Sequence, residues 1–121
     1  MFELPKDDSK YKWTRHSKNK MLFYGISANK IRSIINSPKR KEDGVAENTI
    51  AVMQSNHKPK RNEEIWVMYQ SSKLKTQTNF QYKSSILNSR FLVISAWRYP
   101  GITKPGSPIP IPLNILEELG L

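Results

Sequence analysis

Residues Phe91 to Trp97 read FLVISAW, and this stretch decides the fold because it is the strongest strand pattern in the chain. It is rich in β-branched and aromatic residues and has the length of one strand. Two further stretches share this character, Thr49 to Gln54 (TIAVMQ) and Ile65 to Gln70 (IWVMYQ). All three are apolar at successive positions, which predicts a sheet with both faces covered at least in part.

Two helices are expected to cover one face of this sheet. The pattern from Thr14 to Tyr24 is typical of a helix that ends at Gly25, the residue best able to adopt the left-handed conformation. Ser27 is expected to cap a second helix that runs to about Asn36. Its apolar residues recur at the spacing that places them on one face: Ile31, Ile34 and Ile35.

The C-terminal extension, residues 101–121, is expected to shield the other face. Its proline-rich part is unsuited to a helix or a central strand, so Ile109 and Ile111 can point inward. A short final helix is predicted from Leu113 to Leu119.

The remaining segments are less regular. Ser37 to Gly44 and Asn56 to Glu64 are turn-like and basic, and the second is expected to join two antiparallel strands. Leu74 to Lys83 alternates between apolar and polar residues, which fits a half-exposed strand or a loop.

The predicted fold class is therefore α+β, with two N-terminal helices packed on an antiparallel sheet of three to five strands. A chain of 121 residues has room for a single domain, residues 1–121, in which residues 1–12 are expected to be a flexible arm. The absence of cysteine excludes disulfides and thiolate zinc sites. No stretch resembles a signal peptide or a membrane helix, so a cytoplasmic protein without a membrane partner is expected.

The charge points to a polyanionic partner. Twenty Lys and Arg residues against ten Asp and Glu give a net charge of +10. Residues 1–61 contain 14 basic and 6 acidic side chains, whereas residues 62–121 contain 6 and 4. Such a field attracts nucleic acid through its phosphates, and plain solubility is the alternative explanation.

Familiar catalytic and metal motifs are missing, so no metal and no cofactor is expected. His16 is the first candidate for chemistry, because it lies among basic neighbours, Arg15 and Lys20, that favour the neutral imidazole a general base requires. The alternative is a surface or capping histidine. The second histidine, His57, lies in a basic loop and is expected to be merely solvated.

Two basic loops are candidates for gripping phosphates. They read PKRK at 38–41 and KPKR at 58–61, and arginine suits this role because its planar fork matches two phosphate oxygens. Ordinary charged loops are the alternative. The residues concerned are Lys39, Arg40, Lys41, Lys58, Lys60 and Arg61. Arg15 and Lys20, beside His16, are also expected to bind nucleic acid.

The strongest strand ends in polar and aromatic residues. Trp97 and Tyr99 can stack on bases while Arg98 holds a phosphate. Alternatively, Trp97 belongs to the core and Tyr99 packs on the proline-rich extension.

The opening of the first helix carries a resemblance to a known family. The residues His16, Lys20 and Met21, followed by Tyr24-Gly25-Ile26-Ser27, resemble a family of small domains that open with H-x3-R-M-x2-R-G-I-S. That family looks like a branch of the RelE/ParE toxin superfamily, whose members place two helices against an antiparallel sheet. Here Lys20 and Tyr24 replace the two arginines of the family pattern.

The resemblance implies a toxin of a toxin-antitoxin system that cleaves RNA without metal, with RNA, free or ribosome-bound, and an antitoxin protein as partners. In that chemistry the ribose 2′-hydroxyl attacks the adjacent phosphate, which requires proton transfer and cations. The family's histidine maps onto His16, and residue chemistry adds Arg61, Arg98 and Tyr99 as catalytic candidates. The alternatives are a non-catalytic RNA-binding or ribosome-associated module, and a toxin that acts on a protein.

Overall fold

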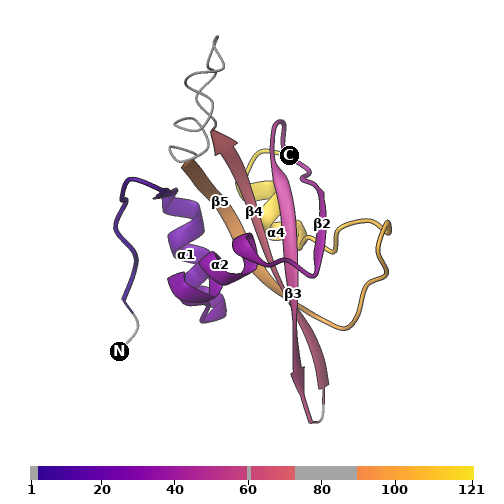
Figure 1. The fold of residues 1–121 in the computed structure, drawn as a ribbon. Coiled ribbons are helices and arrows are strands. Elements are labelled where there is room, and N and C mark those ends of the chain that lie inside the picture. Colours follow the sequence, from indigo (N-terminus) through magenta and orange to yellow (C-terminus); the bar gives the residue numbers. More distant parts are fainter. Residues whose placement is uncertain (1–2, 60, 73–89) are drawn as a thin grey trace, which may run out of the picture.

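A computed structural model describes residues 3–59, 61–72 and 90–121 of the chain. Within these residues the helices and strands follow one another in the order shown in Figure 1. Their bounds are β1 (Tyr11–Trp13), α1 (Arg15–Tyr24), α2 (Ala28–Asn36), β2 (Arg40–Asp43), β3 (Ile50–Lys58), β4 (Arg61–Ser72), β5 (Arg90–Pro100) and α4 (Leu113–Glu118).

The strands form one five-stranded sheet in the order β1-β5-β4-β3-β2. The pairs β2–β3, β3–β4 and β4–β5 are antiparallel, whereas β1 runs parallel to β5 and places Tyr11 opposite Phe91. The α+β class is confirmed. The expectation of an antiparallel sheet is wrong, because the N-terminal strand adds a parallel edge that local sequence patterns do not reveal.

Local capping sets the bounds of the first two helices. Thr14 lies before α1, and its hydroxyl accepts a hydrogen bond from the Ser17 N–H at 3.0 Å. Gly25 ends α1 in the left-handed region, with φ 66°. Two residues later the Ser27 hydroxyl accepts from the Lys30 N–H at 3.1 Å and starts α2.

Two cores lie on opposite faces of the sheet. The helix-side core packs α1 and α2 against one face, and it is dominated by aliphatic side chains that include Ile31, Ile34 and Val67. The C-terminal core lies on the other face and is built around Trp66, Trp97 and Ile115. Figure 1 shows α1 and α2 on one side of the strands and α4 on the other. The C-terminal extension therefore covers the second face as expected.

Two predicted loops differ from the structure. Tyr11 and Lys12, expected in the flexible arm, belong to β1, and Arg40–Asp43 within the predicted turn 37–44 forms the edge strand β2. The antiparallel pair joined by residues 56–64 is confirmed, but its strands continue to the pair Lys58 and Arg61, so the turn is shorter. The segment 74–83 lies outside the described residues.

A bulge in β5 orients the side chains around its centre. Met68 pairs with Ser95 and Tyr69 pairs with Val93, which leaves Ile94 as an extra residue on β5. Val93 packs in the helix-side core, whereas Trp97, two residues beyond Ser95, packs in the C-terminal core. The bulge therefore turns Ser95 toward the face that α4 covers.

Candidate functional site

The helical layer is free of acidic side chains. From Ser9 to Lys41 the sequence contains no Asp or Glu, and this stretch forms β1, α1, α2 and the start of β2. It carries ten cations: Lys10, Lys12, Arg15, Lys18, Lys20, Lys30, Arg32, Lys39, Arg40 and Lys41. The electrostatic potential of this layer is therefore positive, because none of its own side chains carries a negative charge.

Five of these cations lie on the helix side of the sheet and together are called the helical basic face: Arg15, Lys18, Lys30, Arg32 and Lys41. Lys41 belongs to this set because it pairs with Val52, which points into the helix-side core. None of the five forms a salt bridge with a residue that the structure describes. The carboxylate of Asp8 acts on Arg32 from the N-terminal arm.

Neutral contacts orient two members of the helical basic face. Lys30 donates to the Gln54 side-chain oxygen at 2.9 Å, and Arg32 donates to the Asn29 side-chain oxygen at 2.9 Å. The Arg32 guanidinium also lies 5.4 Å from the centre of the Tyr11 ring. These contacts hold the side chains in place without neutralising their charge.

An exposed aromatic side chain lies on the same layer. Phe23 is 72% exposed and its neighbour Leu22 is 53% exposed, although both belong to α1. The Lys20 ammonium lies 5.5 Å from the centre of the Phe23 ring. α1 therefore presents a phenyl ring beside cations, an arrangement suited to stacking on a nucleic-acid base.

His16 is the centre of a polar cluster between α1, β5 and α4. Its Nε2 lies 2.9 Å from the Ser95 hydroxyl, and its Nδ1 lies 3.2 Å from a carboxylate oxygen of Glu118. Lys20, one helical turn further along α1, is 2.9 Å from the same carboxylate. The cluster joins the start of α1 to the C-terminal helix across β5.

The electrostatic balance keeps His16 neutral near pH 7. Burial lowers the pKa of the imidazole, with a further decrease from Lys20 and an opposing increase from Glu118. A neutral ring that donates from Nδ1 to Glu118 has Nε2 free to accept the Ser95 O–H. The imidazole is therefore oriented as a proton acceptor, but Ser95 is fully buried, and 17% of the His16 side chain is exposed.

Arg98 fixes the end of α1 rather than presenting a free cation. Its Nε donates to the Tyr24 carbonyl at 2.7 Å, and its Nη2 donates to the Gly25 carbonyl at 3.0 Å. A third bond of 2.9 Å joins its Nη1 to the Glu63 carboxylate. Arg98 thus satisfies carbonyls that the helix leaves open. It also lines a cavity of about 380 Å³ together with Lys30 and Asn56.

The four residues predicted for catalysis do not share one site. About 13 Å of helix axis separates His16 from Gly25, the residue that Arg98 binds. Tyr99 packs against the C-terminal core, on the opposite face from Arg98. Arg61 is exposed at the outer end of β4, where the β3–β4 hairpin projects beyond the helices in Figure 1.

Three residues predicted to bind nucleic acid are buried. Trp97 is fully buried and stacks on Trp66 with the ring centres 6.2 Å apart, so of its two expected roles the structure has the core one. Arg40 is 5% exposed, binds Glu42 and lies over the Trp66 ring. Lys20 is 6% exposed and holds Glu118. Their charges or rings are used inside the protein.

The other predicted nucleic-acid residues divide into exposed and undescribed ones. Arg15, Lys39 and Lys41 are exposed, and Lys39 donates to the Ser55 hydroxyl at 3.0 Å. The side chain of Lys58 and the whole of Lys60 lie outside the described residues.

Sequence reasoning missed the residues that contact His16. Ser95 and Glu118 lie 79 and about 100 positions from His16, so no spacing rule connects them. The run without acidic residues, counted across both helices, could have indicated Lys18 and Lys30, whereas nothing in it indicates that Phe23 is exposed.

No group of His, Asp or Glu side chains among the described residues has the arrangement of a metal site. In the same part of the chain, every helix is too short or too polar to cross a membrane. No protein-family model, curated protein or solved structure matches this chain.

Proposed function

We propose that the protein is a non-catalytic RNA-binding module that binds RNA through the helical basic face. The observation that carries this proposal is the layer from Ser9 to Lys41, where cations outnumber carboxylates by ten to none. Five of these cations reach the helix side without an ion-pair partner among the described residues. Phosphates are the complementary groups, and their binding gains free energy from the release of counterions.

Single-stranded RNA fits this face better than a duplex. The exposed Phe23 ring offers a surface on which one unpaired base can stack, and each such contact contributes about 1–3 kcal/mol. Bases in a duplex are already stacked on one another, so they do not reach an aromatic ring on a helix surface. Lys18 and Lys30 of the helical basic face then bind phosphates of the same strand.

Fluorescence anisotropy with a short labelled single-stranded RNA tests the proposal. A Lys18→Gln/Lys30→Gln double variant is compared with a Lys39→Gln/Lys104→Gln double variant, which loses the same charge away from the helical basic face. We expect the first to bind at least about tenfold more weakly and to lower the salt slope by about 0.7 for each lost phosphate contact. The second should stay close to the wild type.

Equal losses in the two double variants would show that binding follows total charge rather than the helical basic face. A Phe23→Ala variant adds a test of stacking, because it removes the ring and no charge. Unchanged affinity in that variant would refute the stacking contact. Equal affinity for single-stranded DNA of the same sequence would widen the ligand to nucleic acid in general.

The His16 cluster favours a second candidate function, metal-independent RNA cleavage. The support is a neutral imidazole oriented by Glu118 and placed beside Arg15 of the helical basic face. For cleavage, His16 Nε2 would exchange the Ser95 hydroxyl for a ribose 2′-hydroxyl and take its proton. In the described part of the chain, the two consecutive helices followed by four strands, α1 to β5, are compatible with the resemblance to RelE-like toxins, which would add an antitoxin as a partner.

Incubation with total RNA in the presence of a chelator separates the two candidates. If the second holds, the wild type produces ends with 2′,3′-cyclic phosphate, and a His16→Gln variant binds RNA with unchanged affinity but does not cleave it. Binding without cleavage by the wild type removes the second candidate and leaves the first. Growth arrest on expression without RNA loss would indicate a protein target instead.

A further inference from the structure

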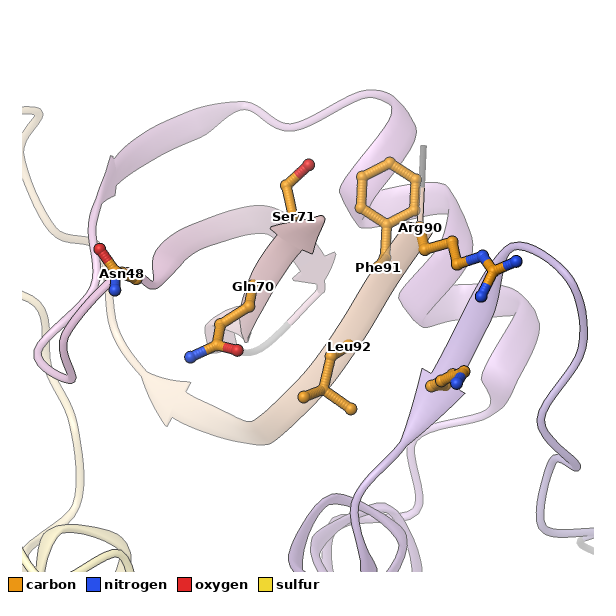
Figure 2. A pocket seen from close by; sticks show the side chains of 7 residues that line it. Asn48, Gln70, Ser71, Arg90, Phe91 and Leu92 are labelled. Atoms are coloured by element: carbon orange, nitrogen blue, oxygen red, sulfur yellow. The ribbon is translucent and has the colours of Figure 1, made fainter. Parts of the chain in front are cut away.

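A second concave region lies at the end of the sheet opposite to the β3–β4 hairpin. This cavity has a volume of about 420 Å³ and is called here the sheet-end cavity. Figure 2 shows its side chains, which come from β1, β4, β5 and the loop before β3. The lining residues are Lys12, Asn48, Gln70, Ser71, Arg90, Phe91 and Leu92.

The strand register gathers three of these side chains on one face. Lys12 and Gln70 both pair with Leu92, so the three form a row across β1, β5 and β4. The neighbours of Lys12 on β1, Tyr11 and Trp13, are buried in the helix-side core. Lys12 must therefore point to the opposite face, away from the helical basic face.

Arg90 adds a second cation to the same face. It lies two residues before Leu92 on β5, so alternation places both on one side of the sheet. In Figure 2 the Arg90 side chain extends toward β1, the strand that carries Lys12. The parallel pairing of β1 with β5 is what brings the two cations together.

The polar side chains of the sheet-end cavity have no side-chain partner among the described residues. Lys12, Arg90, Asn48 and Gln70 form no side-chain hydrogen bond or ion pair with the residues that the structure describes, and no carboxylate lines the cavity. Arg40, Arg98 and Lys20, by contrast, each bind a carboxylate. Asn48 also has a positive φ of 59°, the one non-glycine residue with this conformation in the described part of the chain.

We propose that the sheet-end cavity binds a small phosphomonoester of the size of a nucleoside monophosphate. Two cations without a carboxylate match a phosphate dianion, and the arginine fork can bind two of its oxygens. Neighbouring strands lie about 4.8 Å apart, so about 10 Å separates β1 from β4. A ligand held by Lys12 and Arg90 therefore needs an extended polar body to reach Gln70 and Asn48, with Leu92 beneath it.

Titration of the ¹⁵N-labelled protein with adenosine 5′-monophosphate, followed by NMR, tests this proposal. We expect saturable shifts at residues of β1, β4 and β5 with a dissociation constant of about 1 mM or tighter. Adenosine should produce no saturable shift because it lacks the phosphate. Inorganic phosphate should shift the surroundings of Lys12 and Arg90 more weakly and leave Gln70 unchanged.

Substitutions of the lining residues test which side chains bind the nucleotide. Lys12→Gln and Arg90→Gln should each weaken adenosine 5′-monophosphate binding about tenfold or more, since each removes a charge-assisted hydrogen bond. Lys104→Gln removes an equal charge from the exposed C-terminal extension and should have no effect. Gln70→Ala keeps both cations and should weaken the nucleotide but not inorganic phosphate.

Several outcomes would overturn the proposal. These are the absence of saturable shifts, equal binding of adenosine, and equal weakening by Lys104→Gln. The proposal does not depend on RNA binding, because adenosine 5′-monophosphate is measured without RNA. If the ligand instead displaced RNA from the protein, the sheet-end cavity and the helical basic face would form one site and their separation would be refuted.

Discussion

The two faces of the sheet are covered by different physical means. The helix-side core is sealed by α1 and α2, whose backbone hydrogen bonds are internal and whose apolar residues repeat with the helical period. The C-terminal core is sealed by a proline-rich segment and one helix of six residues. A helix satisfies its own backbone hydrogen bonds, so an apolar stripe is enough to pack it on the sheet. The proline-rich segment lacks the regular internal bonds of a helix, so residues of the sheet must bind its backbone N–H and C=O groups individually.

Those anchors come from charged and aromatic residues of the sheet. The Glu64 carboxylate is buried and accepts the Thr103 N–H at 2.8 Å and the Trp66 indole N–H at 3.1 Å. Arg40 donates to the Ser107 carbonyl, and Trp97 donates to the Pro110 carbonyl at 3.0 Å. The cover of the C-terminal core therefore depends on buried polar bonds between the sheet and the irregular backbone of residues 101–112.

The largest expected effect comes from removing a ring of the C-terminal core. Trp66→Ala should lower the free energy of unfolding by about 3–5 kcal/mol because it opens a large cavity, and Ile34→Ala on the other face by about 2–5 kcal/mol. Urea denaturation measures both. The contrast lies in limited proteolysis, because only Trp66→Ala should expose residues 101–112 to cleavage. Cleavage of both variants in that segment would contradict the independence of the two faces.

Removing the buried carboxylate should have the next largest effect. Glu64→Gln replaces one acceptor oxygen by an amide that faces the donors of Trp66 and Thr103, and we expect a loss of about 2–3 kcal/mol. Glu47→Gln, on an exposed residue, is the control and should change stability by less than about 0.5 kcal/mol. If the two variants were equally stable in urea, the anchor at Thr103 would be unimportant.

A smaller effect is expected for Arg98, a polar anchor on the helix side of the sheet. Arg98→Met removes the bonds to the Tyr24 and Gly25 carbonyls, which are partly open to water, so the loss should be about 1–2 kcal/mol. Hydrogen exchange should accelerate in the last turn of α1 and remain unchanged in α4. Faster exchange in α4 would mean that Arg98 also supports the C-terminal cover.

The smallest effect concerns pH and His16. Burial holds its folded pKa below the ordinary value of 6.5, so the unfolded chain takes up a proton first as the pH decreases. The stability is therefore complete above about pH 6.5 and falls as the pH approaches the lower folded value. His16→Asn should reduce this fall between pH about 7.5 and about 5.5, measured by urea denaturation. If the stability of the variant decreased with pH as much as that of the wild type, other titratable groups would cause the pH dependence.

The elements with local signals were predictable from the sequence. Gly25 and Ser27 mark the boundary between α1 and α2, and the apolar runs mark β3, β4 and β5. β1 has only three residues, and β2 reads RKED. β1 exists because the distant strand β5 pairs with it, and the charged strand β2 exists because the apolar strand β3 pairs with it. No local propensity reveals these pairings. The parallel edge of the sheet was unpredictable for the same reason.

For the candidate site, the sequence identified charged residues but not their partners. Arg40, which was predicted to bind a phosphate, instead donates hydrogen bonds from its guanidinium to Glu42 and Thr103 in this structure. Lys20 and Arg98 are used in the same way by Glu118 and Glu63. Whether a cation is free depends on the tertiary position of each carboxylate, and net charge carries no such information. The RNA and nucleotide proposals therefore use cations that form no salt bridge with the residues that the structure describes.

The position of β5 in the chain bears on how the protein folds during synthesis. β5 lies between β1 and β4, and Thr14 at the start of α1 donates to the Ile94 carbonyl, 80 positions later. The N-terminal strand and first helix must wait for β5 to leave the ribosome before they acquire a partner. Their early exposure and the long loop that must close predict slow folding and a requirement for chaperones. A nascent chain stalled before residue 90 should accordingly remain sensitive to protease.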